Sequence, residues 1–201
     1  VEPEKSIVEK ISGAMNRLGR AHPELSLVLN QSLGIGPPTE KYDRERGAEI
    51  VRAVTAGQGD PETGKAVYAL AQLNCIGCHQ INDVGGTIGP ALDAVGAGLP
   101  LDQIVDSLLY PKRQLKEGYF ATAITTVDEL VHTGYVENED GANIWIRDIA
   151  TNKVRPVSRH QILKRDPIGT LMPPGLTASI SEDQLIDLVS YLASLKGRDP
   201  K

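Results

Sequence analysis

The sequence is short of the residues that small proteins use for covalent cross-links and for large aromatic cores. It contains two cysteines, one tryptophan and one phenylalanine among 201 residues. A framework of structural disulfides is excluded, because such a framework needs several pairs of cysteines. No stretch approaches the run of roughly 18 apolar residues that a membrane-spanning helix requires. We therefore expect no membrane span in this chain.

Charge of one sign is not concentrated in any one place. The formal net charge is −5, and the sequence has no basic stripe. Nucleic acid and anionic lipid are therefore poor candidates for partners, and the mild acidity is most simply explained by solubility. With 40% hydrophobic and 23% charged residues, the composition is that of an ordinary globular protein. The length allows one generous domain, or a small domain with an appendage.

The first residues contain neither an initiator methionine nor a targeting signal. Val1 opens the sequence, and no basic segment followed by an apolar segment comes after it. We expect the chain to be either a processed mature form or a fragment of a larger protein.

The two cysteines lie three positions apart, and a histidine follows the second. In the string Cys75-x-x-Cys78-His79, two thiols can add to the vinyl groups of one haem while the adjacent imidazole reaches the iron. A thioredoxin-like redox pair would follow a strand and precede a helix, but residues 64–73 predict a helix and a glycine-rich loop comes afterwards. A structural zinc site needs two further ligands in a similar pair, which the sequence lacks. The string therefore predicts one covalently bound haem c.

An iron that only exchanges electrons needs a second axial ligand, and few side chains qualify. The candidates are Met15, Met172, His22, His132 and His160. Met172 is favoured, because it lies in a Leu-Met-Pro-Pro-Gly loop whose prolines restrict the backbone and keep the thioether directed inward. Met15 belongs to a segment with apolar residues at helical spacing, and we interpret it as a residue that packs in an apolar core. His132 and His160 remain alternatives, and either would give a bis-histidine site of lower potential.

Helical and strand-like patterns alternate around these residues. Helices are predicted over 64–73, 101–109 and 181–197, the last with Ser181 as its N-cap. Between the second and third helix, four segments rich in strand formers predict a small antiparallel meander. These segments are residues 119–126, 130–137, 142–149 and 153–157. The meander, an insertion over about 119–157, is either a docking face or cap for the haem edge, or a purely structural insertion.

Residues 1–58 carry apolar side chains at helical spacing but no catalytic constellation. Helices are predicted over 7–18, 25–33 and 43–55. We interpret this segment as a helical N-terminal extension packed on a haem domain of residues 59–201, with the remnant of a preceding domain as the alternative.

The region from about residue 59 to 195 resembles a known family through several short segments in a fixed order. They are Gly64-Lys65-Ala66-Val67-Tyr68, Cys75-Ile76-Gly77-Cys78-His79, Gly85-Gly86-Thr87-Ile88-Gly89-Pro90, Ser107-Leu108-Leu109-Tyr110-Pro111, Glu117-Gly118-Tyr119, Thr133-Gly134-Tyr135-Val136, Leu171-Met172-Pro173-Pro174-Gly175 and Asp187-Leu188-Val189-Ser190-Tyr191. This region is similar to the planctomycete-type haem-binding cytochrome c domain. The resemblance implies a mainly α fold: a class I cytochrome c-like helical haem domain with an inserted antiparallel sheet before the methionine loop.

The same resemblance implies a second contact at the haem. The Pro90 carbonyl would accept a hydrogen bond from the His79 ring and so fix the orientation of the imidazole. Domains of this kind are often joined to the end of a larger dehydrogenase-like or helical-repeat protein.

These features predict electron transfer rather than catalysis. A haem ligated by His79 and Met172 has no open position, so we expect a carrier and not an enzyme. The electron-accepting module of a dehydrogenase is one form of such a carrier. The alternative is a haem sensor or haem enzyme with a displaceable sixth ligand. We expect a redox partner protein, either a donor dehydrogenase or an acceptor cytochrome or oxidase. Attachment of haem c takes place outside the cytoplasmic membrane, which predicts a periplasmic or exported protein.

Overall fold

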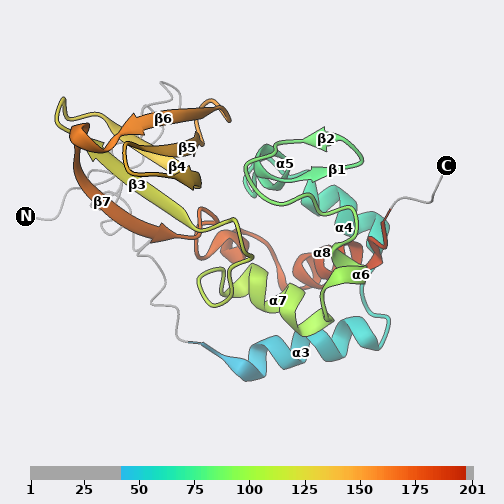
Figure 1. Cartoon of the computed structure of the whole chain (residues 1–201). Helices are drawn as coiled ribbons and strands as arrows, with labels where there is room; N and C mark the ends of the chain where they lie inside the picture. Colours follow the sequence, from blue (N-terminus) through green and yellow to red (C-terminus); the bar gives the residue numbers. More distant parts are fainter. Residues whose placement is uncertain (1–41, 198–201) are drawn as a thin grey trace, which may run out of the picture. The chain divides into compact units, whose positions relative to one another are not determined.

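Four longer helices share one apolar core in the computed structural model, which describes residues 42–197 (Figure 1). Of the two compact units into which the chain divides, the second, Asp43–Lys201, contains every element described below. The helices are α3 (Arg44–Thr55), α4 (Pro61–Tyr68), α5 (Cys75–Cys78), α6 (Val95–Gly98), α7 (Leu101–Leu109) and α8 (Glu182–Ser194), with 3₁₀ turns η1 (Arg159–Gln161) and η2 (Leu176–Ser179). The most deeply buried members of the core are Ile50, Leu73, Val105, Leu185, Leu188 and Val189.

Helices α4 and α8 approach each other closely, and glycine makes this approach possible. A Cβ atom at Gly64 would overlap the main-chain carbonyl of Asp187 on α8. The Asp187 carboxylate in turn accepts a hydrogen bond from the Asp60 amide at 2.7 Å, which fixes the start of α4 against α8. Ser181 forms a capping box with Gln184 at the start of α8. The predicted N-cap at Ser181 is therefore confirmed, as is the predicted helix over 101–109.

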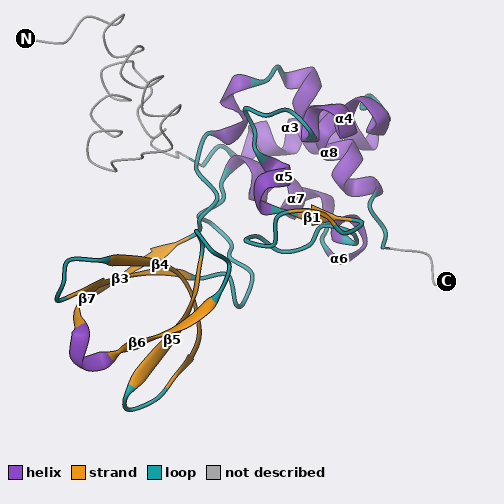
Figure 2. Ribbon diagram, turned by 90° about the horizontal axis from the view of Figure 1, so that it is seen from above, coloured by secondary structure: helices purple, strands orange, loops and turns teal. Residues whose placement is uncertain are grey.

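The second core belongs to a five-stranded antiparallel sheet between α7 and η2. Its strands are β3 (Ala121–Thr126), β4 (Val131–Glu139), β5 (Asn143–Asp148), β6 (Val154–Ser158) and β7 (Ile162–Gly169). The strand order is β6-β5-β4-β3-β7, so the last strand returns to pair with the first. Figure 2 shows the sheet curving, with η1 connecting its two edge strands. Its interior consists of Ile124, Ile144, Ile146 and Val157.

The prediction of a mainly α fold is wrong. Of the described residues, 37% are helical and 24% lie in strands, because the sheet is larger than the predicted insertion. The four predicted strands are present, and β7 adds a fifth that extends the sheet to residue 169. The sequence did not predict β7, because its charged residues and Pro167 interrupt the alternation of apolar and polar side chains that is typical of a strand. An edge strand tolerates proline because one side of its backbone has no ladder partner.

Helix α3 packs on the same core as the later helices. Ile50 is 1% exposed within that core. The Tyr110 hydroxyl group accepts from the Asp43 amide and donates to the Asp43 carbonyl, each at 3.0 Å. The predicted helices over 7–18 and 25–33 lie outside the described residues, and the domain boundary near residue 58 stays a prediction.

Replacement of Ile146 by alanine should destabilise the sheet strongly. Ile146 is fully buried, and truncating such a side chain leaves a cavity that lowers the free energy of unfolding by about 2–5 kcal/mol. Leu163→Ala is the matched control on β7, because Leu163 is 69% exposed and its truncation should cost less than about 0.5 kcal/mol. Denaturant unfolding followed by the fluorescence of Trp145, beside Ile146 on β5, measures both. If Ile146→Ala and Leu163→Ala lowered the free energy of unfolding equally, the sheet would not have a core of its own around Ile146.

Candidate cofactor site

Both cysteines lie on the single helical turn α5, which begins and ends abruptly. Asn74 before it adopts a left-handed conformation with φ of 50°, and His79 after it is extended. The turn therefore presents Cys75 and Cys78 from one short segment and then redirects the chain at His79. Both thiols are free and half-buried, and burial raises the pKa of Cys75. The Cys75 thiol is thus held in its neutral form next to the apolar core.

His79 is held by one nitrogen, which leaves the other available. Its Nδ1 atom lies 2.8 Å from the Pro90 carbonyl oxygen, and only a protonated Nδ1 can donate to that acceptor. The Nε2 atom then has a free lone pair, as a metal-binding imidazole requires. Burial lowers the pKa of His79, and the hydrogen bond to Pro90 opposes this effect. The neutral, ligand-competent form is favoured.

The loop after the turn fits tightly around the histidine because it contains glycines. A Cβ atom at Gly89 would lie 2.5 Å from Cε1 and 2.7 Å from Nδ1 of His79. The Gly89 amide donates to the Cys78 carbonyl at 2.7 Å, and the Gly86 amide donates to the Ile76 carbonyl at 2.8 Å. The loop is thus bonded to the cysteine turn at two points, on both sides of Thr87.

Tyr68, at the end of α4, also holds this segment, although sequence reasoning gave it no role. Its hydroxyl group donates to the His79 carbonyl at 3.1 Å, and only 6% of the residue is exposed. Burial raises the pKa of Tyr68, and the neighbouring Cys75 adds to this rise. The tyrosine therefore remains a neutral donor. A tyrosine seven positions before the first cysteine was the only signal in the sequence.

The structure places Met172 in the loop between β7 and η2. Its backbone amide donates to Thr170 Oγ1 at 3.0 Å, and Gly175 with φ of 71° ends the loop. The Met172 side chain is half-buried and packs against the same core as Cys75. The alternatives lie in the sheet: His132 is on β4 and His160 is exposed in η1. Met15 and His22 fall outside the described residues.

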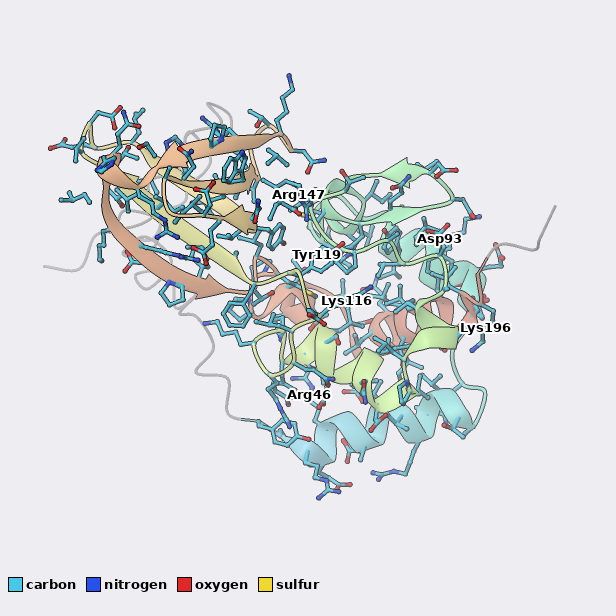
Figure 3. All side chains as sticks on the ribbon, viewed as in Figure 1. Arg46, Asp93, Lys116, Tyr119, Arg147 and Lys196 are labelled. Carbon is cyan, nitrogen blue, oxygen red and sulfur yellow. The ribbon has the colours of Figure 1, made fainter. Side chains whose placement is uncertain are left out.

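The sheet contacts the loop at Thr87, which the sequence gave no reason to expect. Arg147 on β5 donates to the Thr87 carbonyl at 3.2 Å, and the Asn152 side chain bonds the Thr87 hydroxyl. Figure 3 shows Arg147 where the sheet meets this loop. On the sheet itself, Tyr135 is 4% exposed and stacks edge-on against Tyr119, with ring centroids 5.4 Å apart. The sheet thus presents a basic and aromatic cluster on this side.

Residues 61–127 match the family model of cytochrome c. The match covers Cys75, Cys78, His79 and Pro90, and ends before Met172. It supports a cytochrome c-like domain that binds haem and transfers electrons, with haem c bound covalently. No curated protein matches the chain.

The cytochrome c-like domain has residues that fit a haem c. Two free thiols lie on one helical turn. The Nδ1 atom of His79 makes the contact with Pro90, which leaves the Nε2 atom available for a metal. Gly89 lies directly against the imidazole ring. Cys75 and Cys78 would hold the porphyrin through thioethers and His79 would bind its iron, which supplies one-electron redox chemistry when bound. Within residues 42–197, no cluster of three metal-ligating side chains offers another metal site, and no helix is long and apolar enough to cross a membrane.

Proposed function

We propose that this chain is a monohaem electron carrier in which His79 and Met172 are the two axial ligands. The observation that supports it most directly is the contact between His79 Nδ1 and the Pro90 carbonyl, 2.8 Å apart, on the segment that also bears both thiols. This contact orients the imidazole and increases its basicity as a ligand. Cys75 and Cys78 are the attachment points.

Met172 is proposed as the second ligand from its environment and its chemistry. Its side chain packs against the core that also contacts Cys75, and two prolines follow it in the loop. A thioether ligand raises the reduction potential relative to a second imidazole. An iron with both axial positions filled exchanges electrons without binding a substrate, so the chain is proposed to be no enzyme by itself.

The wider role is also a proposal. The resemblance to planctomycete-type domains, with a sheet before the methionine loop, supports a chain that works as the electron-accepting module of a dehydrogenase. Its partners would be that donor and an acceptor cytochrome or oxidase. Because haem c is attached outside the cytoplasmic membrane, a periplasmic or exported location is proposed.

Carbon monoxide separates this function from that of a haem sensor or haem enzyme. The full chain is produced with its haem, titrated for reversible one-electron reduction, and exposed to carbon monoxide at neutral pH. A carrier with Met172 on the iron should titrate reversibly and bind carbon monoxide slowly or not at all. Prompt binding to the reduced protein would contradict the carrier and favour the alternative with a displaceable ligand.

A further inference from the structure

Arg147 connects the sheet to the loop that holds His79. Its Nη1 atom donates to the Thr87 carbonyl at 3.2 Å, its Nε atom bonds Glu137 at 2.6 Å, and its guanidinium lies 4.9 Å from the centre of the Tyr135 ring. Three contacts of one planar group determine its position closely. Asn152 reaches the same Thr87 through the hydroxyl group.

Thr87 lies between the two points at which its loop is bonded to the cysteine turn. Gly86 is bonded to Ile76 on one side and Gly89 to Cys78 on the other, and Pro90 follows directly. Thr87 is thus part of the same short bonded loop as Pro90, whose carbonyl accepts from His79. The sheet thus contacts the loop that carries the acceptor of the His79 hydrogen bond.

The charges of the Arg147–Glu137 pair also lie close to the attachment site. The Arg147 side chain is 21% exposed and the Glu137 side chain 42%, so water screens the cation less than its partner. The guanidinium contacts the Thr87 carbonyl, and the loop that contains Thr87 is bonded to Cys78 through the Gly89 amide.

We propose that Arg147 is a positioning residue for the haem: it holds the loop that orients His79, and with Glu137 it sets the reduction potential. This inference rests on the proposed function, because it needs a haem at Cys75 and Cys78. A nearby cation stabilises the reduced iron, which has one positive charge fewer, and a nearby anion stabilises the oxidised iron. Removing Arg147 or Glu137 should therefore shift the potential in opposite directions.

The test compares the Arg147–Glu137 pair with a matched pair elsewhere on the sheet. Arg165 and Glu139 form an ion pair of 2.9 Å. Arg147 is opposite Tyr135 and Arg165 is opposite Ile124. Tyr135 pairs with Ala121 and so shares its face of the sheet. Ile124 is three positions after Ala121 on β3, and because side chains alternate along a strand it lies on the opposite face. Arg165→Gln thus removes the same charge from the other face.

Reduction potentials are measured at low and high salt on the haem-bound full chain. Arg147→Gln should lower the reduction potential and Glu137→Gln should raise it. Each should change the ratio of oxidised to reduced protein at a fixed applied potential several-fold, and a tenfold change corresponds to about 59 mV for one electron. Both shifts should shrink as salt increases. Arg165→Gln should change the ratio less than twofold. Equal shifts for Arg147→Gln and Arg165→Gln, or shifts of one sign for Arg147→Gln and Glu137→Gln, would overturn the proposal.

Hydrogen exchange tests the positioning role independently of the iron. The amides of Gly86 and Gly89 should exchange several-fold faster in Arg147→Gln than in Arg165→Gln. Arg147→Lys should retain the potential but not the slow exchange, because lysine cannot contact Glu137 and Thr87 with a planar fork. If Arg147→Gln does not fold, Arg147→Lys and Glu137→Gln decide the outcome. If the wild-type protein did not bind haem, the proposed function would be contradicted. If the wild type bound haem but the Gly86 and Gly89 amides exchanged at the wild-type rate in the Arg147 variants, this inference alone would be contradicted.

Discussion

A Gly89→Ala variant is expected to lose the ordered contact between His79 and Pro90. The added Cβ would lie 2.5 Å from His79 Cε1, about 1 Å closer than two carbons normally approach. Either the imidazole or the loop must move, and the loop is bonded to the cysteine turn through the Gly89 amide itself. We expect overpacking to cost about 1–3 kcal/mol of stability, and the histidine ligand to become heterogeneous or to be lost.

The absorption spectrum and the free energy of unfolding of the haem-bound protein measure both effects. Gly98→Ala is the control, because nothing lies within 4 Å of the Cβ that would be added at Gly98 in α6. In a helix this control should be neutral or stabilising by up to about 1 kcal/mol. A Gly89→Ala protein with an unchanged histidine-ligated spectrum would show that the ring is not held as the structure indicates.

A Met172→Ala variant should lose the absorption band near the red end of the spectrum that arises from methionine bound to ferric iron. The reduced variant should then bind carbon monoxide promptly, because the sixth position becomes accessible. Its reduction potential should fall, since the thioether that favours ferrous iron is gone. The chain should still fold, because Met172 is only half-buried at the margin of the core.

The chain provides its own control for this experiment, since it has only one other methionine. Met15→Leu should leave the band, the potential and the carbon monoxide behaviour as in the wild type. Met172→His should restore a six-coordinate iron of lower potential. A band that survives in Met172→Ala would show that another residue is the ligand, and His132→Ala and His160→Ala would then be examined.

Local patterns predicted much of the fold where they were strong. The apolar stripe of α8 and its Ser181 cap, the helix from Leu101 and four strands of the sheet are all present. Each of these depends on neighbours within a few residues, which the sequence displays directly. The strand β7 could not be predicted in this way. Its pairing with β3 joins residues about forty positions apart, and pairing of this kind leaves no local signal.

The site was predictable to the extent that its chemistry is contiguous. Cys75, Cys78 and His79 stand together in the sequence, and the family match covers them. The contacts that hold His79 are less evident, because Gly89 and Tyr68 act through close approach and a carbonyl group rather than through a recognisable motif. Arg147 could not be found at all, since its distance from Thr87 depends on how the sheet folds back.

The central claim is that one haem is bound covalently through Cys75 and Cys78. The mass of the intact chain, measured after denaturation in acid and organic solvent, tests it most directly, because thioethers survive conditions that release ligated haem. The wild type should have the mass of the polypeptide plus one haem, and the double variant Cys75→Ala, Cys78→Ala should have the mass of the polypeptide alone. A wild-type chain that shows only the polypeptide mass, after production with the haem-attachment machinery, would contradict the claim.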